Sequence, residues 1–207
     1  MDLIVLLSFL SAALLLTIMP GPDILFVIAQ SMSQNAKAGI ATALGLCTGL
    51  LVHISAAIIG ISAIIYSSAT IFTIVKFAGA AYLLYLAFCA FKAPTSTIAL
   101  TEKPTIAYHK LYKKGIIMNV LNPKVSIFFL ALLPQFVQGN DNVPIQMLTL
   151  GLIFLVQAYI VFSTVSILSS RVGHFLAKNN FLSKQLNKIE GSLYLIIGAS
   201  IAFSSSK

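Results

Sequence analysis

Long apolar stretches separated by short polar segments dominate the pattern along the chain. Six apolar segments can be marked, at about residues 3–32, 39–65, 68–91, 113–134, 145–169 and 187–204. Runs of about 20 apolar residues match the ~30 Å hydrocarbon core of a bilayer when they form a helix. A helix also satisfies its own backbone N–H and C=O groups, as a lipid environment demands. The pattern therefore predicts an all-α integral membrane protein with six transmembrane helices.

The composition of the chain supports this prediction. Of the 207 residues, 58% are hydrophobic and only 9% are charged, and the mean hydropathy is +0.98. A soluble domain carries roughly 25% charged residues, so most of this chain cannot face water. The net charge of +8 comes mainly from short connections, and we interpret it as a signal of membrane orientation rather than of nucleic-acid binding. We predict a single membrane domain over residues 1–207.

The basic residues favour one orientation of the predicted spans. Residues 66–70 carry no charge, and residues 135–144 carry only Asp141. The other three connections hold ten of the thirteen Lys and Arg residues, which are Lys37, Lys92, Lys103, Lys110, Lys113, Lys114, Arg171, Lys178, Lys184 and Lys188. Because positive residues favour the cytoplasmic side, these connections are predicted to be cytoplasmic. Both termini then face outward.

Two sequence patterns occur twice in the same order, which indicates an internal repeat. K-x-x-G-x-x-Y-L is found at residues 76–83 and again at 188–195. Pro20-Gly21-Pro22-Asp23 in the first span has a counterpart in Asn122-Pro123-Lys124 in the fourth. Since each half has three spans, the second half is inverted, which is a recurring plan of secondary transporters. The predicted parts are repeat one at about 1–91, a cytoplasmic basic loop at about 92–112 and repeat two at about 113–207.

The proline motifs of the first and fourth spans predict broken helices. Each proline removes a backbone donor but suits the first position of a new helix. We expect one helix to restart at Pro22 and another at Pro123, with Asn122 as the N-cap of the second. The N–H groups at such a helix start carry partial positive charge and suit a carboxylate. Simple kinks without a binding role are the alternative interpretation.

Asp23 and Lys124 are ionisable residues inside predicted spans, at matching positions of the two repeats. A charge at membrane depth costs roughly 2.5–3.5 kcal/mol on insertion scales, so each should face a partner or a wet cavity. One hypothesis pairs the two side chains across the two-fold axis. Another has Asp23 bind a substrate ammonium group or a coupling proton. The full set of candidate binding residues is Pro20, Gly21, Pro22, Asp23, Lys76, Asn119, Asn122, Pro123, Lys124 and Gln135.

Other polar residues in the apolar segments allow more than one interpretation. Lys76 lies near a span end, where lysines commonly extend to the lipid headgroups. Asn119 lies three residues before Asn122, on the same helical face, and could line a cavity. His53 and Gln157 are buried polar candidates in the second and fifth spans. For His53, a hydrogen-bonded packing role is the alternative to a role in proton relay.

The sequence contains no recognisable catalytic constellation. Gly-x-Ser-x-Gly, His-Glu-x-x-His and a Walker loop are all missing, so the chain does not itself hydrolyse ATP. Cys47 and Cys89 lie within apolar runs without metal-binding spacing, so packing is their expected role. We predict no enzymatic activity, no cofactor and no metal site. A proton gradient is the simplest source of energy for uphill transport.

Several of these segments together resemble the LysE superfamily, and within it the homoserine/threonine resistance (RhtB) family of amino-acid exporters. They are Pro20-Gly21-Pro22-Asp23, residues 39–45, residues 76–86, and residues 115–136 with Asn122-Pro123-Lys124 and Pro134-Gln135-Phe136. The resemblance covers nearly the whole chain. It implies a multi-pass exporter in the bacterial inner membrane that exchanges homoserine-, threonine- or leucine-like zwitterions for protons.

The resemblance leaves the particular substrate open. Because the superfamily also includes relatives that handle metal ions, transport of another small solute or cation is one alternative. Cys, Met and carboxylates do not cluster here, which argues against a soft or multivalent metal site. A membrane-embedded enzyme and a structural subunit are further alternatives. The oligomeric state stays open and includes a homo-oligomer.

Overall fold

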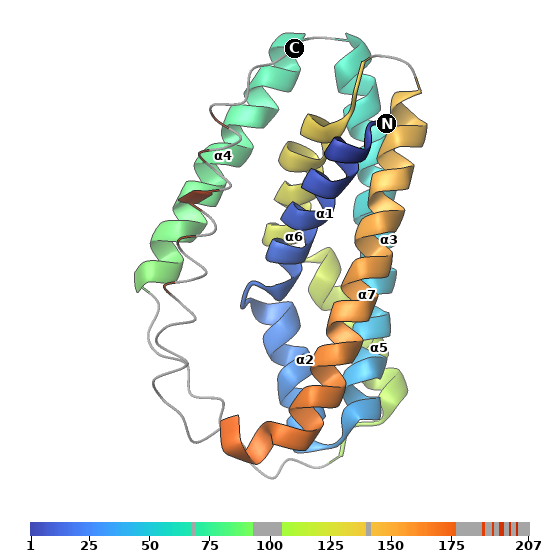
Figure 1. The fold of residues 1–207 in the computed structure, drawn as a ribbon, viewed down its shortest axis with the longest axis vertical. Coiled ribbons are helices and arrows are strands. Elements are labelled where there is room, and N and C mark those ends of the chain that lie inside the picture. The colour runs from blue at the N-terminus through green and yellow to red at the C-terminus, as the bar shows by residue number, and fades with distance from the viewer. Residues whose placement is uncertain are drawn as a thin grey trace.

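The computed structural model describes residues 1–67, 69–92, 105–139 and 142–176, together with six single positions between 188 and 202. Within these residues every regular element is a helix, and the helices form an elongated bundle (Figure 1). In chain order they are α1 (Leu3–Ile18), α2 (Pro22–Ser33), α3 (Ala36–Ser67), α4 (Ala69–Lys92), α5 (Tyr108–Val120), α6 (Pro123–Ile127), the π-helix η1 (Phe128–Leu132), the 3-10 helix η2 (Leu133–Phe136) and α7 (Val143–Leu176).

Two of the predicted spans are broken at their proline motifs. The axes of α1 and α2 differ by 56°, and those of α5 and the helix from Pro123 to Phe136 differ by 48°. Pro22 and Pro123 each begin the new helix, where a missing N–H costs little because that group has no partner within the helix. The predicted helix breaks are therefore confirmed.

Helix length and composition place the chain in a membrane. Within the described residues, Ala36–Gly60 of α3 and Val143–Arg171 of α7 are long and apolar enough to cross a bilayer unbroken. Counting each bent pair as one span raises the number to as many as four. In α4 a shorter apolar stretch covers Phe77–Cys89. Most of the segment predicted at 187–204 lies outside the described residues, so the six-span count and the inverted repeat stay predictions.

The two broken helices run in opposite directions through the bundle. In Figure 1, α1 and α6 occupy its upper part, whereas α2 and α5 occupy its lower part. Aromatic packing joins α1 to the two short helices that continue from α6, with the ring of Phe9 centred 6.0 Å from that of Phe128 in η1 and 5.3 Å from that of Phe136 in η2. The long helix α3 packs along α5, and α7 packs against α1 and α2. Both breaks lie in the interior, against α3 and α7.

Glycines allow α3 and α5 to approach each other closely. A Cβ atom at Gly45 would overlap the carbonyl oxygen of Tyr112, and one at Gly115 would lie 2.6 Å from the carbonyl oxygen of Thr42. Both neighbours are backbone atoms, which cannot move aside as a flexible side chain can. Close contact through small residues is typical of helix packing in membranes, where backbone approach supplies van der Waals contact.

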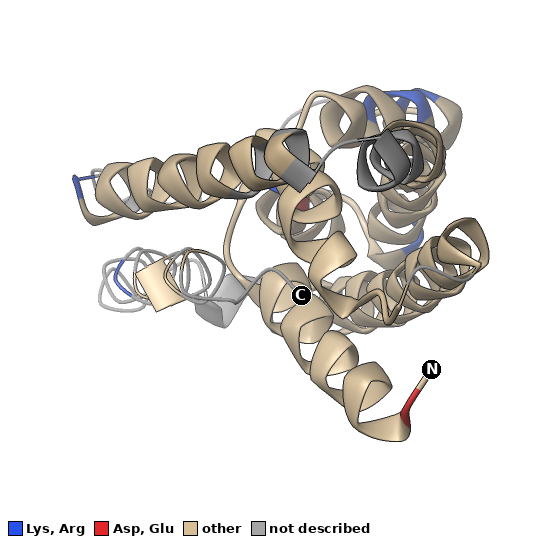
Figure 2. Cartoon of the chain, turned by 90° about the horizontal axis from the view of Figure 1, so that it is seen from above, with Lys and Arg blue, Asp and Glu red and all other residues tan. Residues whose placement is uncertain are grey.

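The helix α5 begins at Tyr108, inside the segment predicted as a basic loop. Its buried residues are Leu111, Gly115 and Asn119, and Leu111 is fully buried. The ammonium group of Lys114 lies 4.5 Å from the ring centre of Phe26, and the Tyr108 hydroxyl donates a hydrogen bond to Asn35. The basic residues therefore extend from one side of a packed helix. Figure 2 looks down the bundle and shows how few charges the described helices carry.

Candidate functional site

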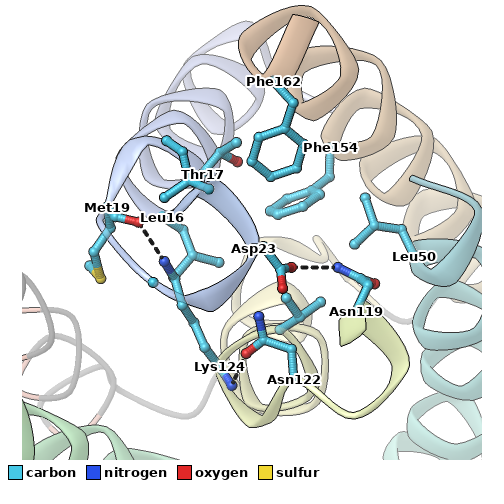
Figure 3. Close-up of a pocket in the computed structure, with 13 residues that line it drawn as sticks. Leu16, Thr17, Met19, Asp23, Leu50, Asn119, Asn122, Lys124, Phe154 and Phe162 are labelled. Atoms are coloured by element: carbon cyan, nitrogen blue, oxygen red, sulfur yellow. Dashed lines mark hydrogen bonds between the residues drawn. The ribbon is translucent and has the colours of Figure 1, made fainter. Parts of the chain in front are cut away.

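A small cavity lies where the two helix breaks meet (Figure 3). Its polar lining comes from the broken helices, and Leu50 of α3 with Phe154 and Phe162 of α7 adds an apolar wall. The cavity has a volume of about 20 Å³, and a water molecule needs roughly 10–15 Å³ on this measure. In this structure the cavity thus has room for about one water molecule and not for an amino acid.

Asp23 places a buried carboxylate at the start of α2. The residue is 7% exposed and lies in the first turn, where the N–H end of a helix stabilises an anion. Its Oδ2 atom accepts a hydrogen bond of 2.9 Å from the side-chain amide of Asn119. Its Oδ1 atom is buried and has no hydrogen-bond partner among the described residues. One carboxylate oxygen is therefore available to a group that enters the cavity.

Lys124 approaches the other side of the same break. Its Nζ atom donates a hydrogen bond of 3.0 Å to the carbonyl oxygen of Met19, the residue that caps the end of α1. The carbonyl end of a helix carries partial negative charge, so a cation is stabilised there. A Cβ at Gly21 would lie 3.3 Å from Nζ, so the glycine leaves space for this lysine. The cation of Lys124 in α6 thus stabilises the C-terminal end of α1.

Asn122 is the N-cap of α6, as the sequence predicted. Its side-chain oxygen accepts a hydrogen bond of 3.1 Å from the backbone N–H of Lys124. Proline occupies the intervening position and has no N–H to offer. The cap therefore satisfies one of the free donors at the helix start and fixes the direction in which Lys124 leaves the backbone.

Replacing Asn122 with Ala should lower the free energy of unfolding by about 1 kcal/mol, the usual effect of losing an N-cap. The N122S variant keeps an oxygen acceptor and should lose much less. Thermal unfolding of the purified protein in detergent would measure both effects. Equal losses in the two variants would contradict the capping role.

The structure brings only part of the predicted set to the cavity. Gln135 lies apart from it in η2, where its side-chain amide donates to the carbonyl oxygen of Ala131 at 3.3 Å. The side chain of Lys76 lies outside the described part of the structure. Pro20, Pro22 and Pro123 belong to the breaks without lining the cavity. The predicted residues that do line it are Gly21, Asp23, Asn119, Asn122 and Lys124.

Three buried residues outside the predicted set hold the ends of the broken helices. The side-chain amide of Gln157 donates to the hydroxyl of Thr17 at 2.8 Å, and His53 Nε2 donates to the carbonyl oxygen of Asn119 at 2.9 Å. The sequence marked His53 and Gln157 as polar residues in apolar spans. Thr17 gave no such signal, because a helical threonine commonly bonds its own helix, as this one does to Ala13.

Helices long enough to span a bilayer, with a polar centre between two helix breaks, define a multi-pass membrane protein. The profile of the family described as LysE type translocator matches residues 14–205. The chain therefore belongs to the LysE family of translocators, and the resemblance found in the sequence is confirmed.

Curated relatives match the chain over nearly its full length. A homoserine/homoserine lactone efflux protein of Salmonella typhimurium is 31% identical over 195 residues, which is 94% of each chain. A leucine efflux protein of Salmonella choleraesuis is 25% identical over 197 residues, covering 94% of this chain and 93% of the relative. An uncharacterized membrane protein of Vibrio cholerae is 30% identical over 202 residues, 98% of each chain. No solved structure gives a significant match.

Proposed function

We propose that this protein exports zwitterionic amino acids across the bacterial inner membrane in exchange for protons. The observation that carries the proposal is the buried carboxylate of Asp23 in a cavity between two broken helices, where one of its oxygens has no hydrogen-bond partner in the described part of the chain. Such breaks recur where secondary transporters bind their substrates. The relatives named for efflux of homoserine and leucine support neutral amino acids as the substrate class.

The polar groups of the cavity suit the two charges of a zwitterion. The substrate ammonium group would donate to Asp23 Oδ1. The substrate carboxylate would sit at a half-helix N-terminus, near the N–H groups at the start of α2, which no side chain of its N-cap Gly21 covers. Lys124 lines the same cavity and adds positive charge on that side. The wall of Leu50, Phe154 and Phe162 would then contact a neutral side chain.

Competition for Asp23 would couple the substrate to the proton. A buried carboxylate is costly at membrane depth, and Oδ1 of Asp23 gains a partner when a proton or an ammonium group binds there. If the two bind alternately, protein that releases an amino acid outside returns with a proton. The cavity must enlarge to admit the amino acid, and two inverted three-helix repeats would let it open to each side in turn. In the proposed orientation the basic connections face the cytoplasm and both termini face outward.

Efflux from liposomes tests the proposed function directly. Purified protein would be reconstituted into liposomes. These liposomes would be loaded with a panel of radiolabelled neutral, acidic and basic amino acids and diluted into acidic buffer. We expect faster efflux of at least one neutral amino acid than from protein-free liposomes, and slower efflux once an uncoupler collapses the proton gradient. Absence of efflux across the whole panel would overturn the proposal and favour a structural role.

A further inference from the structure

Two hydrogen bonds tie the broken helices to the unbroken helices that flank them. Gln157 of α7 donates to Thr17, the second-last residue of α1, at 2.8 Å. His53 of α3 donates to the carbonyl oxygen of Asn119, the second-last residue of α5, at 2.9 Å. All four residues are buried, at 8% exposure or less. Each bond thus lies at the end of the half-helix that leads into a break.

The two bonds occupy equivalent places in the proposed repeats. Thr17 and Asn119 are 102 positions apart, and His53 and Gln157 are 104 apart, close to the 101 that separate the helix-starting residues Pro22 and Pro123. The bonds also cross between the halves in a reciprocal way. The first half supplies His53 to the broken helix of the second, and the second half supplies Gln157 to the broken helix of the first.

The bonded half-helices reach the cavity from opposite ends of the bundle. In Figure 1, α1 descends from the upper end and α5 rises from the lower end. Releasing α1 from α7 would therefore open a path from one side, and releasing α5 from α3 would open a path from the other. Both are single hydrogen bonds, and such bonds are weak enough to break and re-form during a transport cycle.

We infer that these bonds are a matched pair of latches, the Thr17–Gln157 latch closing the cavity toward the outer face and the His53–Asn119 latch closing it toward the inner face. Thr17, Gln157 and His53 are then positioning residues for transport, since they act on the half-helices rather than on the substrate. The inference rests on the proposed function, because it assigns the two latches to the two openings of an alternating-access exporter.

Accessibility of a cysteine in the cavity, measured from each side, tests the two latches. The reporter is I24C, at a buried position that lines the cavity beside Asp23, in a chain that also carries C47A and C89A. A membrane-impermeant maleimide would be applied to intact spheroplasts and to inside-out vesicles. We expect T17V, which removes the hydroxyl acceptor, to raise the labelling rate roughly three- to tenfold from the outer side only. We expect H53L to give a similar increase from the inner side only.

Matched variants separate the loss of a latch from a general disturbance of packing. T17S keeps the hydroxyl, and H53Q keeps an N–H donor, so each should label close to the parent rate. If T17V does not accumulate in the membrane, Q157L removes the same bond from the other partner. Increases on the same side, no increase from either variant, or equal effects of T17V and T17S would overturn the inference.

The labelling result can be told apart from a failure of the proposed function, because labelling requires no substrate. Opposite-sided increases combined with no amino-acid efflux from liposomes would leave the latches in place and overturn the substrate proposal. Efflux that follows the proton gradient, combined with unchanged labelling in T17V and H53L, would overturn the latches alone.

Discussion

Replacing Asp23 with Asn is expected to reduce amino-acid export by at least about 30-fold while leaving the protein in the membrane. The substitution removes the negative charge that the substrate ammonium group and the coupling proton would share. Loss of one partner of a buried charged pair costs about 2–5 kcal/mol, which is the basis for this magnitude. Membrane insertion should survive, because asparagine avoids the cost of a buried charge and its oxygen can still accept from Asn119.

The D2N variant is a matched control for this experiment. Asp2 is exposed at the N-terminal end of α1, where its carboxylate accepts a hydrogen bond of 2.7 Å from the side chain of Gln138. The same chemical change there should leave efflux within about twofold of the parent, since a bond at an exposed site contributes little. Efflux from reconstituted liposomes gives both rates. A D23N protein that exports at the parent rate would refute the assigned role of Asp23.

Replacing Gly45 with Ala is expected to lower the free energy of unfolding by about 1–3 kcal/mol, the range for overpacking a close contact. The added methyl group would meet the carbonyl oxygen of Tyr112 and force α3 away from α5. A lower free energy of unfolding would point to the close contact as its cause, because helix propensity alone favours alanine over glycine by about 1 kcal/mol. Thermal unfolding in detergent and the amount of folded protein in the membrane measure the effect.

Gly60 provides the control on the same helix. A Cβ atom at Gly60 has no neighbour within 4 Å, so the G60A variant should be neutral or slightly more stable than the parent. If G45A and G60A unfold at the same temperature, close contact between α3 and α5 is not what requires glycine at position 45.

The helix breaks could be predicted from the sequence because their cause is local. A proline lacks an N–H whatever surrounds it, so a proline motif within an apolar run indicates a break before any partner is known. Asp23 and Lys124 could be singled out for a similar reason, since each is a charge inside such a run. Asn122 followed directly from the residue types that cap a helix beginning with proline.

The partners of these residues could not be predicted in the same way. Lys124 bonds to the backbone carbonyl of Met19, an acceptor that every residue carries and that no side-chain pattern reveals. Gln135 lies away from the cavity, beyond the π-helix η1 and within the 3-10 helix η2, and both helices change the rotation per residue after Ile127. Regular helical spacing from Asn122 therefore says little about the face that Gln135 occupies.

The hydrogen bond between Asp23 and Asn119 also bears on how the protein is made. The two residues are 96 positions apart, and at about 5–20 residues per second a ribosome takes about 5–20 s to synthesise the chain between them. Throughout that interval the first span carries its carboxylate without the amide that later binds it. Until α5 has been made, Asp23 must therefore be stabilised in another way, by water, by the insertion machinery or by a bound proton.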